Sequence, residues 1–105
     1  MIRELNRVVI TGMGAISPLG NSVAEFWKNI VAGKPGVGTI TRFDTTHFKT
    51  KIAAEVKGFT PTTYFEKNEA RKYDLFTQYA VAAADEAIKN AALDFDRLNK
   101  NRIGV

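Results

Sequence analysis

The spacing of apolar positions changes along the chain, and each spacing predicts a different element of secondary structure. The first apolar run covers residues 7–12 (Arg-Val-Val-Ile-Thr-Gly), is rich in β-branched residues and ends at a glycine. Such a short run is typical of a buried strand. Glycine, serine and proline then recur through residues 12–20, which predicts a turn-rich connection.

The next pattern predicts a helix over about 22–32. Its apolar residues recur at intervals of three and four, which places them on one helix face: Val23, Phe26, Trp27, Ile30 and Val31. Ser22 and Glu25 have the spacing of a capping box, in which both side chains satisfy free amides at a helix start. Gly33 stands where a C-terminal cap belongs. We expect the two aromatic residues of this face to pack in a core.

The middle of the chain has weaker patterns. Residues 33–50 contain three glycines and one proline with little periodicity, which predicts irregular surface structure. Residues 51–56 place alternate apolar side chains on one side, as a short edge strand does. Thr60 and Pro61 are typical of an N-cap followed by the first helical position, so we expect a brief helical turn around 61–65.

A second long helix is predicted over about 68–91. Its expected buried face consists of Tyr73, Phe76, Ala80, Ala83, Ala87 and Ala91. The many alanines imply that a backbone or a large side chain packs close against this helix. Asp85 and Lys89 have the spacing of an ion pair on the other face. Residues 102–105 are typical of the start of another strand.

Together these elements predict an α/β fold. A strand, two helices and a second strand on the same sheet form a right-handed crossover unit. Such a unit needs further strands and helices to cover both faces of its sheet. We therefore expect residues 1–105 to be the opening portion of a larger α/β domain.

Composition narrows the classes of function. The 105 residues are 45% hydrophobic and 25% charged, which is typical of a globular protein and excludes a disordered or collagen-like chain. The sequence has no cysteine and one histidine, so it holds no disulfide, no Cys nucleophile and no multi-His metal site. We expect no metal and no cofactor. The longest purely apolar stretch, Ala80–Ala84, is far shorter than the roughly 18 residues of a membrane span, so we expect a cytoplasmic chain without a membrane partner.

The positive charge of the chain lies mainly in one region. The net charge is +4, and the part from Phe26 to Lys57 carries the whole excess. Its basic residues are Lys28, Lys34, Arg42, Lys49, Lys51 and Lys57, against the acidic Asp44 and Glu55. These bases are spread over several predicted elements without the clustering or interleaved aromatics of a nucleic-acid platform. We expect a mildly basic solvated surface and no nucleic-acid partner.

Gly12-Met-Gly14, between a predicted strand and a predicted helix, is the strongest candidate for a phosphate-binding loop. The dinucleotide-binding pattern fails at its third glycine, because Ser17 occupies that position. A tight turn at the end of a strand is the favoured interpretation of these glycines. A small phosphate-binding domain that uses Gly12 and Gly14 remains an alternative.

Other candidate catalytic groups are isolated. His47 lies three residues after Asp44, the spacing of a base and its orienting carboxylate, but only ordinary threonines lie nearby as nucleophiles. We therefore interpret His47 as a surface or turn residue. Asp94 and Asp96 are spaced like solvated loop residues without a third ligand. The residues alone predict no assembled active site.

The order of the segments resembles the opening of the β-ketoacyl synthases, the condensing enzymes of fatty-acid and polyketide synthesis. The segments that carry the resemblance are 7–21, Trp27 with 32–37, 43–45, 51–59, 69–79 and 102–105. They agree with the bacterial 3-oxoacyl-acyl-carrier-protein synthase II type in order and spacing. The resemblance covers essentially the whole chain and makes it the N-terminal part of the family's N-terminal domain.

This resemblance implies a thiolase-like fold of two similar α/β halves, of which the chain would supply the first strand-helix-loop-helix-strand portion. It implies that the full-length protein is an acyltransferase, which extends acyl chains by decarboxylative Claisen condensation with malonyl-acyl carrier protein. The family's catalytic cysteine and two histidines lie after the second strand, so none corresponds to a residue here. We expect the chain alone to be inactive scaffold. A non-catalytic relative, such as a polyketide chain-length partner, remains an alternative.

The resemblance also implies partners. The family typically forms homodimers and accepts acyl and malonyl groups from an acidic acyl carrier protein. A basic patch at the start of the equivalent helix faces that carrier, which suggests docking by Lys67, Arg71 and Lys72. Asn68 departs from the family pattern, because that position is often basic. The alternative is a solvated face that neighbouring carboxylates partly neutralise.

Overall fold

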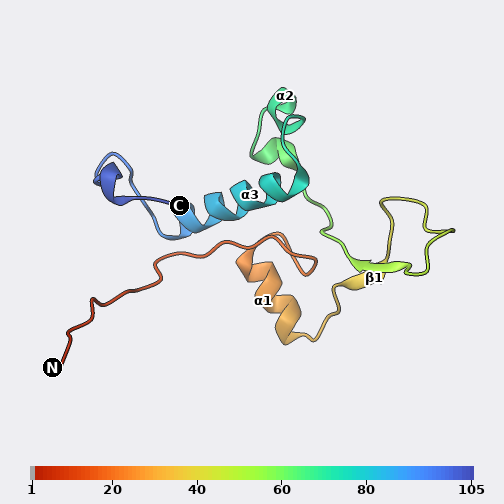
Figure 1. Cartoon of the computed structure of the whole chain (residues 1–105), viewed down its shortest axis with the longest axis horizontal. Helices are drawn as coiled ribbons and strands as arrows, with labels where there is room; N and C mark the ends of the chain where they lie inside the picture. The colour runs from red at the N-terminus through yellow and green to blue at the C-terminus, as the bar shows by residue number, and fades with distance from the viewer. Residues whose placement is uncertain (1) are drawn as a thin grey trace.

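Helix α3, Leu75–Asn90, is the longest element of the computed structural model, which describes residues 2–105 (Figure 1). Its sequence is rich in alanine, which has the highest helix propensity. Lys89 Nζ lies 2.6 Å from Asp85 Oδ2 one turn away, which confirms the predicted ion pair. No helix within residues 2–105 has both the length and the apolar character needed to cross a bilayer.

Helix α1, Val23–Val31, confirms the predicted first helix and the Ser22 half of its capping box, while the Glu25 carboxylate reaches the amide one residue before the N-cap. Glu25 N donates to Ser22 Oγ at 3.1 Å, and the Glu25 carboxylate accepts from Asn21 N at 3.1 Å. Gly33 has a φ of +66° just after the helix, the left-handed conformation that glycine adopts without strain.

Strands β1, Val37–Thr39, and β2, Ile52–Ala54, form an antiparallel pair in which Val37 lies opposite Ala54. Strand β2 confirms the predicted edge strand. Strand β1 lies in residues 33–50, for which irregular structure was predicted, and corrects that part of the prediction. Two glycines, Gly36 before the strand and Gly38 within it, hid the strand in the sequence pattern, and the pairing with β2 selects the conformation.

The second helical region is divided. A short 3₁₀ helix, η1 (Pro61–Thr63), confirms the predicted turn after Thr60. Helix α2, Lys67–Ala70, then ends at its C-cap Arg71. The prediction of one continuous helix over about 68–91 is therefore wrong between α2 and α3.

The interruption has a physical cause in Gln78 of α3. Its Nε2 donates to the carbonyl of Ala70 at 2.8 Å and to that of Tyr73 at 3.1 Å. These carbonyls would accept bonds from later amides if the helix continued. Asp74, with an extended backbone, starts α3 afresh. The buried side chain of Gln78 thus stabilises the break.

The predicted strands at the two ends are not formed. Residues 2–11 are extended and exposed, and no strand includes residues 7–12. Residues 100–102 form a 3₁₀ helix, η2 (Lys100–Arg102), and residues 103–105 are irregular. A strand requires a hydrogen-bonded neighbour, and the only ladder within residues 2–105 joins β1 to β2. The predicted crossover unit on one sheet is therefore incorrect for this part of the chain.

The buried core of residues 2–105 is small. Only Ala82 and Gln78 are buried, while Phe76, predicted on the buried face, is 74% exposed. Ala83, Ala87 and Ala91 of that face are half-buried. Within residues 2–105 Trp27 is 63% exposed and Phe26 is half-buried, so the core packing expected of these α1 aromatics is incomplete in this part of the domain.

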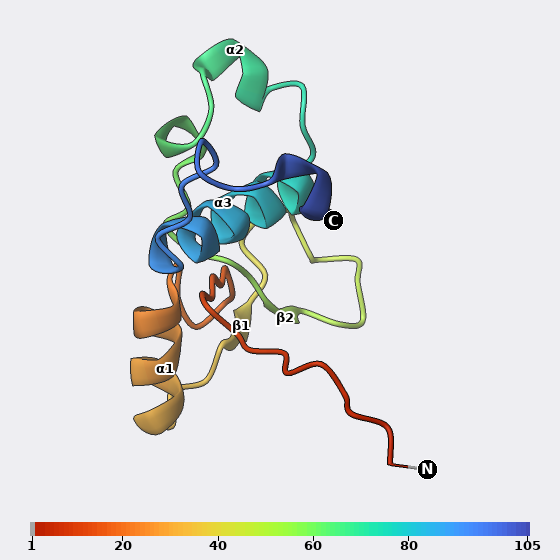
Figure 2. The same cartoon turned by 90° about the vertical axis from the view of Figure 1, so that its left-hand side faces the viewer.

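The global dimensions agree with this open packing. The accessible surface is 9139 Å², whereas a compact monomer of this length exposes about 5,800 Å². The radius of gyration is 18.3 Å, against about 13 Å for a compact domain. Figures 1 and 2 show the N-terminal segment and the β1–β2 hairpin extending away from α3. Most large apolar side chains therefore lack a covering layer.

Candidate functional site

Gly12 and Gly14 lie directly against the backbone of α3. A Cβ atom on Gly14 would overlap the carbonyl oxygen of Ala83 and lie 2.7 Å from its carbonyl carbon. A Cβ on Gly12 would lie 2.7 Å from the Cβ of Ala91. The close packing predicted from the alanines is confirmed, and backbone approach, rather than a tight turn, explains these two glycines.

Polar side chains of α3 hold the connection that begins at Gly12. Glu86 Oε2 accepts from Ala15 N at 2.9 Å, and Glu86 Oε1 accepts from Val23 N at 2.9 Å. One turn further along α3, Asn90 Oδ1 accepts from Met13 N at 3.1 Å. The carboxylate of Glu86 also lies at the N-terminus of α1, where the helix dipole favours a negative charge.

This arrangement contradicts the phosphate-binding alternative. The N–H groups of Met13 and Ala15, which would face a phosphate, already donate to Asn90 and Glu86. The Glu86 carboxylate would also repel an anion at this position. The glycine turn therefore serves as a packing contact.

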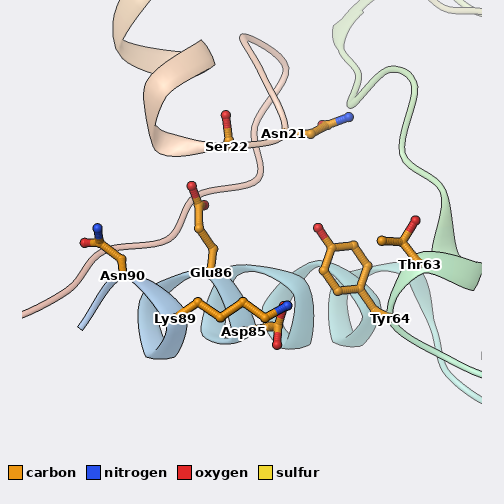
Figure 3. Close-up of a pocket in the computed structure, with 8 residues that line it drawn as sticks. All are labelled: Asn21, Ser22, Thr63, Tyr64, Asp85, Glu86, Lys89 and Asn90. Atoms are coloured by element: carbon orange, nitrogen blue, oxygen red, sulfur yellow. The ribbon is translucent and has the colours of Figure 1, made fainter. Parts of the chain in front are cut away.

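Sequence reasoning missed Glu86 and Asn90. Both lie on the helix face that meets the glycine turn, four residues apart (Figure 3). The sequence did contain a signal, since Glu86 and Asn90 are polar residues on an otherwise alanine-rich helix face. Polar groups that are partly buried need hydrogen-bond partners, and backbone amides can supply them.

An open pocket of about 380 Å³, lined by residues that carry polar groups, lies between α3, η1 and the start of α1 (Figure 3). Its lining residues are Asn21, Ser22, Thr63, Tyr64, Asp85, Glu86, Lys89 and Asn90. Asn21 Nδ2 donates to the carbonyl of Lys57 at 2.8 Å, which ties the start of α1 to the segment after β2. The hydrogen bond from Lys89 to Asp85 raises the pKa of Lys89. The pocket holds hydrogen-bonding groups without a paired nucleophile and base.

A second, more apolar groove of about 690 Å³ lies beside α1. Its lining residues are Met13, Val23, Ala24, Phe26, Trp27, Glu86 and Asn90. The exposed Trp27 ring belongs to this groove, so the apolar face of α1 is open to another surface.

The three predicted docking residues lie together on α2 and the turn that follows it. Lys67 is the first residue of α2, Arg71 is its C-cap and Lys72 comes next; all three are exposed (Figure 1). No hydrogen bond or ion pair involves their side chains within residues 2–105. The expectation that Arg71 and Lys72 lie near the first turn of a long helix is wrong, because α2 ends before them. Arg71 and Lys72 follow the C-terminus of α2, where a positive charge does not oppose the dipole of that helix.

The isolated candidates behave as loop residues. Asp44 Oδ1 accepts from Thr46 N at 3.0 Å, and its hydrogen bonds with Thr46 lower the pKa of Asp44. That carboxylate therefore engages Thr46, while His47 is exposed. Asp94 accepts from Asp96 N and pairs with Arg97 at 3.3 Å. The described part of the chain places no three potential metal-ligating side chains together.

One hydrogen bond ties the segment after β1 to α3, and others close the hairpin on itself. Arg42 Nη2 donates to Tyr79 Oη at 3.0 Å and to the carbonyl of Val56 at 3.2 Å, and the bond to Tyr79 raises the pKa of Arg42. Thr41 Oγ1 donates to Glu55 Oε2 at 2.8 Å, and this bond lowers the pKa of Glu55.

Comparisons with known proteins agree with the sequence resemblance. The family described as "Beta-ketoacyl synthase, N-terminal domain" matches residues 5–105. The "3-oxoacyl-[acyl-carrier-protein] synthase 2" of Vibrio cholerae is 48% identical over 99 residues, which cover 94% of this chain and 24% of that protein. The protein of the same name from Staphylococcus aureus (strain COL) is 50% identical over 99 residues, with the same coverage.

A solved structure, "The ishigamide ketosynthase/chain length factor", is similar with a TM-score of 0.69 and 38% sequence identity. The similarity covers 87% of this chain and 23% of that one. The chain thus spans about a quarter of the length of the relatives it matches. The small α/β arrangement of α1, α3 and the hairpin corresponds to part of a ketosynthase.

Proposed function

Because the chain belongs to the β-ketoacyl synthase family, we propose that it is the N-terminal part of a condensing enzyme that extends fatty acyl chains. The reaction would be decarboxylative Claisen condensation of an acyl group with malonyl-acyl carrier protein. The observation that carries this proposal is the family match over residues 5–105, together with about 50% identity to synthases named for this substrate class.

Within such an enzyme, residues 1–105 would be scaffold of a thiolase-like domain. The sequence contains no cysteine, so the thiolate that accepts the acyl chain must come from another part of the protein. The Gly12–Gly14 contact would hold the connection against α3, and Glu86 would hold the start of α1 there. We further propose that the full-length protein is a cytoplasmic homodimer.

The carrier-protein surface would be the exposed cluster of Lys67, Arg71 and Lys72. Three cations within six positions, free of ion pairs in the described residues, suit an acidic partner. Glu66, Glu69 and Asp74 lie nearby in sequence and moderate this charge. Each exposed pair with a carrier carboxylate is worth about 0.2–1 kcal/mol, so the three cations would act together on association.

The test is the combined variant Lys67→Glu, Arg71→Glu and Lys72→Glu in a full-length protein that contains this chain. We expect weaker carrier binding and a reduced dependence of binding on salt. The matched control reverses three exposed lysines elsewhere, Lys28, Lys34 and Lys49. If both variants bind the carrier like the wild type while remaining folded, this docking surface is incorrect.

A second candidate is a non-catalytic chain-length partner of a ketosynthase. This second function is kept because the similar solved structure is named as a ketosynthase with its chain length factor. Condensation assays on the full-length protein distinguish the two functions. Carrier-dependent condensation supports the enzyme, and a folded, carrier-binding protein without condensation supports the partner.

A further inference from the structure

The basic cluster of Lys67, Arg71 and Lys72 lies on an element that is too short to hold its own shape. Helix α2 has four residues, whereas an isolated helix in water is only marginally stable even at about 12–15 residues. Figures 1 and 2 both show α2 set apart from α3. The direction in which these cations point is therefore set by contacts outside the helix itself.

Two aromatic residues close the segment that contains α2. Phe65 lies two residues before α2 and Tyr73 lies three residues after it. Their ring centroids are 5.4 Å apart, with an angle of 39° between the ring planes. Aromatic pairs interact at centroid distances of about 4.5–7 Å and add stability beyond the area that they bury. Residues 65–73 thus form a closed loop, whose two ends stay together while the rings are in contact.

Both ends of this loop are also attached to neighbouring elements. The Phe65 amide donates to the carbonyl of Pro61 in η1 at 3.0 Å, and α2 packs against η1. At the other end, the carbonyl of Tyr73 accepts from Gln78 Nε2 at 3.1 Å. All of these contacts are made within residues 61–78. The ring pair therefore joins two backbone positions that are each anchored already, and it completes the frame around α2.

We infer that Phe65 and Tyr73 are positioning residues, which hold the basic cluster in one fixed array for an acidic carrier protein. This inference rests on the docking surface proposed above. A preorganised array loses less conformational freedom when its partner binds, and the gain appears mainly as slower dissociation. The two rings carry no charge, so the long-range attraction of the carrier depends on the cations and not on the rings.

The test measures the association and dissociation rate constants of acyl carrier protein, without an acyl chain, on a full-length protein that contains this chain. Phe65→Leu and Tyr73→Leu each break the ring contact and keep an apolar side chain. We expect either substitution to raise the dissociation rate constant about two- to tenfold. The association rate constant and its salt dependence should stay at the wild-type values. Tyr73→Phe retains the ring and should dissociate like the wild type.

Phe48→Leu is the matched control. The rings of Phe43 and Phe48 are also 5.4 Å apart, but they lie between β1 and β2. This control should leave carrier dissociation unchanged. The double variant Phe65→Leu, Tyr73→Leu should dissociate no faster than the faster of the two single variants, because either substitution alone removes the pair. Additive effects would show that the two rings act independently, as they do if each touches the carrier directly, and would overturn the inference.

The charge reversal of the basic cluster separates this inference from the proposed docking surface. If that triple variant binds the carrier like the wild type, the docking surface is incorrect and the inference fails with it. If the triple variant binds weakly while both leucine variants dissociate like Phe48→Leu, only the positioning role is wrong. Thermal melting identifies any variant with a disturbed fold. Because the two leucine variants remove one contact from its two sides, either folded variant decides the outcome.

Discussion

The backbone N–H of Val23 donates to Glu86 Oε1 at 2.9 Å, so the first residue of α1 is held by a carboxylate from α3, 63 positions later in the chain. The second oxygen of the same carboxylate accepts from Ala15 N. Glu86 therefore joins a loop, a helix start and a second helix. Local capping by Ser22 starts α1, and this long-range bond fixes where α1 lies relative to α3.

Replacing Glu86 should release these contacts in a graded way. Glu86→Gln retains one carbonyl acceptor and can satisfy only one of the two amides, whereas Glu86→Ala satisfies neither. A part-buried donor left unsatisfied costs about 1–3 kcal/mol at most. Amide hydrogen exchange at Ala15 and Val23 should therefore accelerate most in Glu86→Ala. Asp85→Asn is the control on the same helix, and exchange at Val23 that is as fast in this control as in Glu86→Ala would refute the assignment.

Adding a side chain at Gly14 should separate the glycine turn from α3. In Gly14→Ala the new Cβ overlaps the Ala83 carbonyl, which is backbone and cannot rotate away. Overpacking of this kind costs about 1–3 kcal/mol. Gly38→Ala is the matched control, because nothing lies within 4 Å of its added Cβ. We expect thermal unfolding monitored by circular dichroism to shift downward only for Gly14→Ala; equal melting of both variants would contradict the packing role.

The hairpin should loosen in acid through Glu55. Its pKa is lowered in the folded chain by hydrogen bonds from Thr41, so the carboxylate stabilises the hairpin at pH values above its unfolded pKa. That contribution is lost as the pH falls through the folded pKa. NMR titration should show that Thr41→Val, which removes the Oγ1 donor, raises the pKa of Glu55 toward its ordinary value. An unchanged titration in this variant would show that Thr41 does not cause the shift.

The 105-residue chain should have no condensing activity by itself. The acyl-enzyme step requires a thiolate, and the sequence has no cysteine. Carrier-dependent condensation by the chain, purified free of host enzymes, should equal that of a buffer blank. A full-length protein containing the chain serves as the positive control under the proposed function, and activity of the chain above the blank would contradict the prediction.

The sequence correctly predicted the elements whose stabilising residues lie close together along the chain. Helix α1 has its cap, its apolar face and its terminal glycine within about a dozen residues, and the structure confirms it within one residue at each end. The ion pair of Asp85 and Lys89 is equally local. The family resemblance, which depends on the order of several segments, is confirmed by the match over residues 5–105.

Elements that depend on distant partners were less predictable. The apolar run at 7–12 has strand propensity but no neighbour to pair with among residues 2–105, whereas β1, only three residues long with a central glycine, is formed by its pairing with β2. The break before α3 was missed because it depends on a glutamine that reaches back eight residues. Glu86 was missed because its partners are 63 and 71 positions away. Docking by Lys67, Arg71 and Lys72 stays a prediction.

The two hydrogen bonds from Gln78 to the carbonyls of Ala70 and Tyr73 affect the direction of α2 as well as the point where α3 begins. They fix the corner between α2 and α3, so a residue in the second turn of α3 determines which way α2 points. The uncharged amide of Gln78 therefore determines the orientation of the basic residues Lys67, Arg71 and Lys72 relative to α3. Replacement of Gln78 by leucine, which fills a similar volume without donors, would leave those cations present and exposed but free to turn relative to α3.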